Sequence, residues 1–263
     1  MVNVTVLVEE RYRQQAQPTG LVSALLALGA SVRVLGDDEL PSQLGPTDVV
    51  VARGRSEALL EALRQAEAAG YMVLDPAAAV AAVRDKAAMA TVLERTGLPL
   101  PQTWTGTGPE LATALADLAM ERIPRGLIAK PVLGDNSRGI YRIGEPNDLA
   151  TIEGDLVVQE FVPGTGADLK LYAIGSQVWA VRKPSPVTAC LLGASELGAV
   201  EVTPRLRELA LECGAAFGLT MFGVDCVEAG DEVVVIEVND FPNYTHVPQA
   251  GHLLARHVLA RAA

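Results

Sequence analysis

The sequence predicts a mixed α/β fold, in which a small parallel N-terminal lobe precedes two α+β lobes with antiparallel sheets. Within the first 75 residues, short β-rich runs alternate with helical patterns, which is typical of a parallel sheet covered by helices. From Gly126 onward, β-rich runs follow one another across glycine-bearing turns, which favours antiparallel pairing. The length of 263 residues accommodates several small lobes. We expect these lobes at residues 1–84, 85–158 and 159–263.

The N-terminal lobe is expected to alternate strands with helices. Apolar and β-branched residues place its strands at 2–8, 31–35, 48–52 and 71–74. Its helices are expected at 19–28 and 56–69, because Gly29 and Gly70 can end them and Ser56 is a suitable N-cap. No GxGxxG follows the first strand, so the sequence lacks a dinucleotide-binding fingerprint.

The rest of the chain is expected to hold helices at 85–96, 110–120, 203–217 and 251–263. Its strands are expected at 127–132, 140–143, 156–162, 168–175, 177–183, 222–228 and 232–239. Residues 98–101, LPLP, should be extended, because a residue before proline avoids the helical region. The strands at 156–162 and 168–175 flank a glycine-rich turn, and we expect a hairpin around residues 229–231.

Charge and targeting signals exclude several classes of partner. Lys and Arg number 21 and Asp and Glu 32, a net charge of −11, which disfavours binding to nucleic acid or anionic membranes. The sequence has no signal-peptide pattern and no bilayer-spanning apolar stretch, so we expect a cytoplasmic protein. Cys190, Cys213 and Cys226 are too widely spaced for a disulfide framework or a CxxC metal site, and we interpret them as buried thiols.

Three oxygen-bearing side chains near the C-terminus form a candidate metal site. Glu237 and Asn239 alternate on one predicted strand and therefore share a face, and Asp225 lies on the preceding strand. Asp225 points to the same side if the turn between the strands holds an odd number of residues. Mg²⁺ prefers carboxylate and amide oxygens, completed by water and substrate phosphate. The alternative is a set of strand-end charges satisfied by solvent or a salt bridge.

Two lysines are candidates for binding a phosphate. Lys130 interrupts a β run, and the loop after it contains Gly134 and Gly139, which let backbone N–H groups approach an anion closely. Lys86 lies in the first turn of a predicted helix, where its charge opposes the helix dipole unless an anion binds nearby. The loop is not a Walker sequence. The alternatives are a hairpin loop beside an edge lysine, and a surface lysine.

The segment VVQEFVPGTGAD is a candidate base-binding region. An adenine ring needs an apolar slot beside exposed backbone donors and acceptors, and a strand that leaves its sheet at a Pro-Gly turn offers both. Asp168, after the turn, is placed to accept a bond from a ribose hydroxyl. The alternative is an ordinary hairpin with solvated acids. The candidate base-binding residues are Gln159, Glu160, Phe161 and Val162.

Taken in order, these segments resemble an ATP-grasp enzyme. Between about residues 85 and 250, the order and spacing of four segments match those of that family's motifs. The segments are RDK, IAKPVLGDNSRG, VQEFVPGTGADLKLYAIG, and FGVDCVE followed by VIEVND. Within that family, the segments DLKLYAIG and EVN resemble RimK-type carboxylate–amine ligases. The segments FGVDCVE and NDFPNYTHVP resemble the inositol trisphosphate kinase branch. The resemblance implies an ATP-grasp fold whose last two lobes clamp ATP.

The resemblance also implies how the nucleotide is held. Lys86 and Lys130 would hold the α- and β-phosphates. Residues 134–139 would fold over the β- and γ-phosphates. Adenine would lie against residues 159–162, and the ribose against Asp168. The loop residues assigned in this way are Gly134, Asn136, Ser137 and Gly139.

For the reacting end, the resemblance implies two Mg²⁺ ions, which Mn²⁺ can replace. Their ligands would be Asp225, Glu237 and Asn239, with Glu237 bridging the ions. Arg182 and Lys183 would face the transferring phosphoryl group as catalytic residues, where cations stabilise the developing charge.

One segment departs from the RimK-type pattern. After the AVRK position those ligases carry Arg-x-Asn and a glycine pair, whereas this sequence continues PSPVTACLLGASELGAVEVTP. The acceptor pocket is therefore built differently, or its cations come from elsewhere. His246 is either close to the metals or a structural histidine. Four arginines at predicted strand ends are candidate cations for this pocket, and each can also be explained as a surface residue. They are Arg11, Arg13, Arg53 and Arg55.

The preferred hypothesis is an ATP- and Mg²⁺-dependent ligase that joins a small carboxylate or peptide to an amine through an acyl phosphate. The alternative is a kinase for a polyol or an inositol phosphate, against which the low content of Lys and Arg argues. A nucleotide-binding protein without turnover is disfavoured because Lys130 and the candidate metal ligands are all present. The expected partners are ATP, the two substrates and a second copy in a homodimer; the sequence does not identify the acceptor.

Overall fold

The N-terminal lobe is built on a parallel four-stranded sheet in the order β2-β1-β3-β4, as the strand and helix alternation predicts. The computed structural model describes residues 1–37, 44, 48–116, 126–134, 139–185, 188, 192–193 and 196–262. Within this lobe, β3 is buried at every position, as expected for a central strand covered on both faces. The strands are β1 (Asn3–Val8), β2 (Ser31–Gly36), β3 (Val49–Arg53) and β4 (Met72–Leu74).

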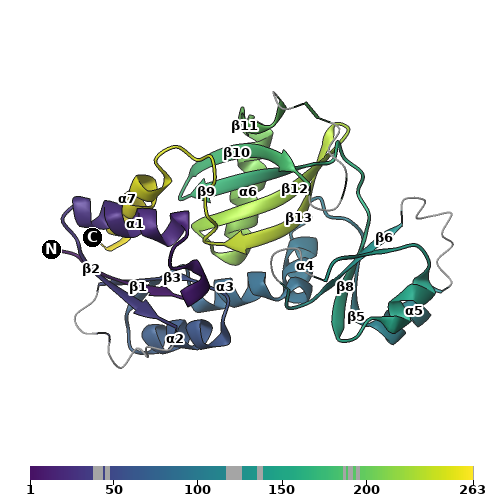
Figure 1. Cartoon of the computed structure of the whole chain (residues 1–263), viewed down its shortest axis with the longest axis horizontal. Coiled ribbons are helices and arrows are strands. Elements are labelled where there is room, and N and C mark those ends of the chain that lie inside the picture. The colour runs from purple at the N-terminus through teal and green to yellow at the C-terminus, as the bar shows by residue number, and fades with distance from the viewer. Residues whose placement is uncertain are drawn as a thin grey trace.

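Helices cover both faces of the parallel sheet (Figure 1). On one face lies α2 (Glu57–Ala68), which begins where the Ser56 hydroxyl accepts a bond from the Leu59 N–H. On the other face, α1 (Ala16–Ala27) packs against α7 (Ala250–Ala262). Helix α7 falls within the expected C-terminal lobe, 159–263, but its apolar side packs in one core cluster with α1, β1 and β3 as well as with residues of that lobe.

The central lobe contains an antiparallel sheet in the order β5-β8-β6-β7. The Asp85 carboxylate accepts bonds from the N–H groups of Ala87 and Ala88 and thereby caps α4. The expected helix at 110–120 is α5, which ends at Leu115; residues 117–125 lie outside the described residues. The elements are α4 (Lys86–Arg95), β5 (Thr103–Thr107), α5 (Gly108–Leu115), β6 (Leu127–Pro131), β7 (Tyr141–Ile143), the 3-10 helix η4 (Pro146–Thr151) and β8 (Asp155–Glu160).

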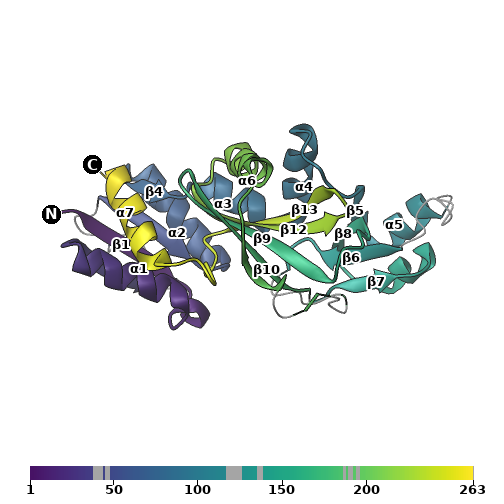
Figure 2. The ribbon, with the colours of Figure 1, turned by 90° about the horizontal axis from the view of Figure 1, so that it is seen from above.

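The C-terminal lobe contains an antiparallel sheet in the order β11-β10-β9-β12-β13. Helix α6 lies over one face of this sheet, together with α3 and α4 (Figure 2). Apolar residues fill the layer between them, and the polar positions of β9, β12 and β13 face the other way. The elements are β9 (Ala167–Ile174), β10 (Gln177–Pro184), β11 (Gly198–Val200), α6 (Pro204–Phe217), β12 (Met221–Ala229) and β13 (Glu232–Asp240).

The structure differs from the sequence pattern in several places. The runs around the glycine-rich turn 163–167 do not form a hairpin, because β8 pairs with β5 and β6 whereas β9 pairs with β10 and β12. The segment between them therefore links two lobes. The elements that the sequence pattern does not predict are α3 (Ala77–Arg84), β5, β11, η4 and a 3-10 helix, η1 (Glu10–Tyr12). Cys213 and Cys226 are buried thiols as expected, and Cys190 lies outside the described residues.

None of the helices in the described part of the chain is both long enough and apolar enough to cross a bilayer.

Candidate active site

All three lobes contribute to one cavity of about 480 Å³. The central lobe supplies residues of α4, β6 and β8, and the C-terminal lobe supplies residues of β9, β10, β12 and β13. The N-terminal lobe closes one end with residues from η1 and from the carboxyl end of β3. Ligands of open α/β sheets usually bind at the carboxyl ends of the strands. The cavity therefore combines a cleft between two antiparallel sheets with the ligand-binding edge of a parallel one.

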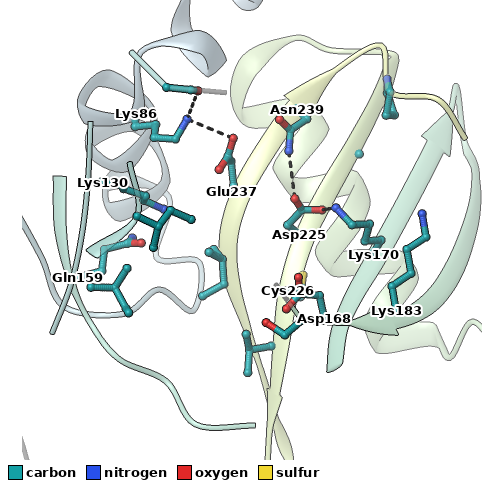
Figure 3. Close-up of a pocket in the computed structure, with 18 of the residues that line it drawn as sticks. Lys86, Lys130, Gln159, Asp168, Lys170, Lys183, Asp225, Cys226, Glu237 and Asn239 are labelled. Carbon is teal, nitrogen blue, oxygen red and sulfur yellow. Dashed lines mark hydrogen bonds and ion pairs between the residues drawn. The ribbon is translucent and has the colours of Figure 1, made fainter. Parts of the chain in front are cut away.

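Every lysine in the sequence lines this cavity. The sequence contains four lysines, and the chain as a whole has a net charge of −11. Figure 3 shows Lys86 and Lys130 on one side of the β12–β13 hairpin and Lys170 and Lys183 on the other. Lysines are normally scattered over the surface. Their concentration here favours an anionic ligand in this cavity.

The β12–β13 hairpin brings the candidate metal ligands together. The turn has two residues, 230–231, so a regular ladder would place Asp225 opposite Ile236. A β-bulge between Asp225 and Cys226 shifts the register by one residue, and Asp225 lies opposite Glu237 instead. The turn is even-numbered, but the bulge supplies the shift that an odd-numbered turn would give. Asp225, Glu237 and Asn239 share the face that lines the cavity.

Cations and amides contact these three side chains (Figure 3). Asp225 Oδ1 accepts a bond from Lys170 Nζ at 2.7 Å, and Asp225 Oδ2 accepts one from Asn239 Nδ2 at 3.3 Å. Glu237 Oε1 lies 3.4 Å from Lys86 Nζ. Asn239 Oδ1 accepts a bond from Arg55 Nη2 at 2.6 Å. The residues form two groups that face the cavity: Lys170, Asp225, Asn239 and Arg55 in one, and Lys86 with Glu237 in the other.

The donor set fits Mg²⁺. It consists of two carboxylates and an amide, which are hard oxygen ligands, and their side chains lie at the wall of the cavity. Among the described residues, no group of three or more His, Cys, Asp and Glu side chains could hold a metal by itself. Mg²⁺ is commonly bound by one or two carboxylates together with substrate phosphates and water, so a pair of acids beside an anion site suffices.

The two expected phosphate ligands are buried lysines. Lys86 is 5% exposed and donates from Nζ to the Gly134 carbonyl at 2.8 Å. Lys130 is also 5% exposed. Burial lowers the pKa of Lys130, and the charge of Glu237 partly opposes this by raising it. Buried ammonium groups of this kind are costly without an anion. Gly134 lines the cavity. Gly139 is not among the lining residues, and Asn136 and Ser137 lie outside the described residues.

The link between the central and C-terminal lobes lines one end of the cavity. Gln159, Glu160, Phe161 and Val162 all line it, as does Asp168. Gln159 is 7% exposed and donates from Nε2 to Thr103 Oγ1 at 3.2 Å. Arg142 stacks over the Phe161 ring, 4.6 Å from its centroid. Burial raises the pKa of Asp168, and a bond to Ser185 opposes the rise. The candidate base-binding residues are thus brought together.

Of the two expected catalytic residues, only Lys183 lines the cavity. Its Nζ donates to Tyr172 Oη at 3.1 Å. Arg182 precedes it on β10 and therefore points to the opposite face. There Arg182 forms a bidentate ion pair with Glu228, with both N···O distances 2.7 Å. The expectation that Arg182 faces the transferring group does not agree with this placement.

The four candidate acceptor arginines divide into two pairs. Arg53 and Arg55 line the cavity at the end of β3, whereas Arg11 and Arg13 are not among the lining residues and form ion pairs with Glu9 and Glu10. His246 is exposed and is also outside the lining set.

Sequence reasoning missed Lys170 and Tyr172, which line the cavity from β9. The sequence pattern could have indicated them, because Asp168, Lys170 and Tyr172 alternate along one predicted strand and so share a face. It also missed Tyr12 and Gln15, which belong to no sequence motif, and Asn243, which lies in the NDFPNYTHVP segment but was assigned no role.

The chain is similar to known proteins of one family. The ATP-grasp domain family matches residues 83–242. A probable alpha-L-glutamate ligase of Shewanella loihica is 28% identical over 201 residues, which is 72% of this chain and 65% of that protein. The chain therefore spans just under two thirds of that relative. The probable alpha-L-glutamate ligase 2 of Shewanella frigidimarina is 28% identical over 260 residues, 88% of this chain and 86% of that protein.

Solved structures share the fold at lower identity. The D-cycloserine synthetase DcsG superposes with a TM-score of 0.77 at 18% identity, covering 99% of this chain and 100% of that one. A RimK-domain ATP-grasp protein of Sphaerobacter thermophilus superposes with a TM-score of 0.75 at 21% identity, covering 98% of this chain and 100% of that one. Both structures have the arrangement of lobes described above across nearly their whole length.

Proposed function

Because this chain belongs to the ATP-grasp family, we propose that it is an ATP- and Mg²⁺-dependent ligase that joins a carboxylate to an amine. The observation that carries the proposal is the cavity in which all four lysines meet the Asp225–Glu237–Asn239 face. ATP-grasp ligases generally use ATP and Mg²⁺. The curated relatives are named as ligases, which favours ligation over the kinase alternative.

In this proposal each part of the cavity has a role in holding ATP. Adenine lies against residues 159–162, and Asp168 accepts a bond from the ribose. Lys86 and Lys130 neutralise the phosphates next to them, which the burial of both lysines supports. Asp225, Glu237 and Asn239 would hold the two Mg²⁺ ions, which Mn²⁺ could replace. The metal would polarise the γ-phosphate and neutralise its charge.

The chain's own residues then stabilise two transfers. A carboxylate oxygen attacks the γ-phosphorus, and ADP leaves with an acyl phosphate formed. An amine nitrogen attacks the acyl carbon, phosphate leaves, and the nitrogen loses a proton to give an amide. Lys183 and Lys170 lie across the hairpin from Lys86 and Lys130 and are placed to stabilise negative charge that develops during both transfers. A homodimer and a cytoplasmic location remain predictions from the sequence.

Turnover should require two co-substrates. We expect ADP release from Mg-ATP only when a carboxylate and an amine are supplied together, measured with a panel of amino acids, dipeptides and polyols. Phosphate and an amide product should appear in equal amounts with ADP. ADP release with a polyol alone, accompanied by a phosphorylated polyol, would instead establish the kinase.

The two neighbouring cations of β10 should behave differently. Arg182→Gln is expected to leave kcat close to that of the unchanged chain and to lower the free energy of unfolding by about 1 kcal/mol or less, because it removes a partly exposed ion pair. Lys183→Gln should lower kcat by about 10²-fold, because it removes a cation from the reacting end. Steady-state kinetics and thermal unfolding of both variants test this. Equal losses of kcat would contradict the assignment.

A further inference from the structure

Arg84 is a buried arginine that stands apart from the cavity. It is the last residue of α3 and is 8% exposed. Within the RDK segment, Asp85 caps α4 and Lys86 lines the cavity, whereas Arg84 is not among the lining residues. A buried guanidinium is costly unless its N–H donors have acceptors. The acceptors that Arg84 contacts therefore indicate its role.

The Arg84 guanidinium holds the backbone on both sides of Arg55. Its Nη2 donates to the Gly54 carbonyl at 2.6 Å, and its Nη1 donates to the Ser56 carbonyl at 3.4 Å. From the other direction, Glu9 Oε2 accepts bonds from the N–H groups of Arg55 at 2.5 Å and Ser56 at 3.1 Å. Two side chains of opposite charge thus hold the loop 54–56 at four backbone groups.

The loop also packs closely at Gly54. A Cβ on this residue would lie 2.7 Å from Glu9 Cβ and 2.7 Å from Leu59 Cδ2. Side chains do not approach one another that closely, so glycine is required where the loop passes between the end of β1 and the first turn of α2. Close packing and four hydrogen bonds together leave the backbone around Arg55 little freedom.

The same guanidinium contacts the strand that Arg55 contacts. Arg84 Nη2 lies 3.3 Å from Asp240 Oδ2, and Asp240 follows Asn239 on β13. Arg55 Nη2 donates to Asn239 Oδ1 at 2.6 Å. Arg84 therefore holds the segments that carry the donor and the acceptor of the Arg55–Asn239 hydrogen bond.

We propose that Arg84 is a positioning residue, which holds the Arg55 guanidinium against Asn239 at the reacting end of the cavity. The inference rests on the proposed ligase function, because Arg55 then adds a fixed positive charge where the transfers occur. A preorganised charge stabilises the negative charge of a transfer without having to move during the reaction. Arg182 pairs with Glu228 outside the cavity, so Arg55 supplies a guanidinium from the N-terminal lobe instead.

Replacing Arg84 should affect turnover and nucleotide binding differently. Arg84→Gln is expected to lower kcat at least about tenfold, because Arg55 loses its fixed position. The affinity for Mg²⁺ and a nonhydrolysable ATP analogue should stay close to that of the unchanged chain, because Arg84 does not line the cavity. Steady-state kinetics with the carboxylate and amine that support turnover, and calorimetric titration with the analogue, measure the two quantities.

A double-mutant cycle shows whether Arg84 acts through Arg55. Arg55→Gln should lower kcat at least as much as Arg84→Gln does. In a chain that already carries Arg55→Gln, the change at Arg84 should cause no further loss, because the group that it positions is gone. A residue that only stabilised the fold would give losses that multiply.

Arg84→Lys repeats the cycle with the charge retained. An ammonium is a compact donor, whereas the planar guanidinium presents Nη1 and Nη2 to different carbonyls. We therefore expect Arg84→Lys to fold and to keep the low kcat. This variant also carries the test if Arg84→Gln does not fold.

Asp75→Asn is the matched control. Asp75 also joins the N-terminal lobe to β12, through bonds from the N–H groups of Thr220 and Met221, both at 2.9 Å, and it is not among the lining residues. Asp75→Asn should lower the melting temperature and leave kcat close to that of the unchanged chain. It separates the loss of a contact between lobes from the loss of the position of Arg55.

Amide hydrogen exchange tests the clamp without turnover. In the ligand-free chain, Arg84→Gln and Arg84→Lys should each speed exchange in the peptide that spans residues 54–57, and Asp75→Asn should not. Losses of kcat that multiply, full kcat in Arg84→Lys, or unchanged exchange in this peptide would each overturn the inference. If no carboxylate and amine support turnover, the proposed function fails, and faster exchange would still establish the clamp as a structural contact.

Discussion

Replacing Glu237 with glutamine is expected to lower kcat by about 10²–10³-fold while the fold stays intact. Glu237 lies opposite Asp225 on the hairpin, and its Oε1 is 3.4 Å from Lys86 Nζ. Glutamine keeps the shape of the side chain and removes its charge, so the change affects the binding of cations rather than packing. ADP release at saturating Mg-ATP gives kcat, and circular dichroism with thermal unfolding checks the fold.

Glu228→Gln is the matched control, because Glu228 lies on the same hairpin and pairs with Arg182 outside the cavity. We expect its kcat to stay close to that of the unchanged chain. Near-normal turnover in Glu237→Gln, or an equal loss in Glu228→Gln, would show that the charge of Glu237 has no special role.

Replacing Lys130 with methionine should produce two opposite effects. Mg-ATP binding should weaken at least about tenfold, or about 1.4 kcal/mol, because a buried cation beside the phosphates is lost. The ligand-free protein should become more stable, because burial disfavours the charged lysine and lowers its pKa, and methionine carries no charge to desolvate. Calorimetric titration and chemical denaturation measure the two effects separately.

The stability gain should depend on pH. Below the lowered pKa of Lys130 both folded and unfolded states are protonated, and the full cost of the buried charge is present. Above it, up to the ordinary lysine value of 10.5, the unfolded chain binds more protons, so stability rises with pH. Lys130→Met should remove this rise. Its stability advantage should therefore be largest near neutral pH and shrink in alkali.

Lys170→Met is a control for which we expect the opposite change in stability. Burial acts to lower the pKa of Lys170, but the charge and hydrogen bond of Asp225 outweigh it and the pKa is raised. Lys170 therefore stabilises the fold below its unfolded pKa, and this contribution is lost as pH rises through the folded value. Lys170→Met should destabilise the ligand-free chain. A destabilised Lys130→Met variant would contradict the account of Lys130.

Much of the cavity lining could be predicted because its residues interrupt regular patterns. Lys130 interrupts an apolar strand, and Glu237 and Asn239 alternate along another strand. The spacing of these residues and their polar side chains together predicted that they line the cavity. The assignment of Arg182 failed for a related reason. Consecutive strand residues face opposite sides, and which side holds the site depends on the pairing of β10 with β9, which is not a local property.

Other features depend on contacts that no local pattern encodes. The bulge between Asp225 and Cys226 is a one-residue shift that appears only when β12 and β13 are paired. Strands β8 and β9, separated by a Pro-Gly turn, have the pattern of a hairpin, yet they pair in separate sheets. Helix α3 was missed because AAAVAAVR, rich in alanine, carries little polar contrast to mark its faces.

The placement of the lysines has a practical consequence for chemical labelling. Apart from the N-terminal amine, every primary amine of the chain lies at the wall of one cavity, and the remaining positive side chains are guanidinium groups. Acylating reagents and amine-directed cross-linkers therefore have no lysine targets on the outer faces. Such reagents are poorly suited to mapping assemblies of this protein, but the extent of acylation directly reports whether the cavity is filled.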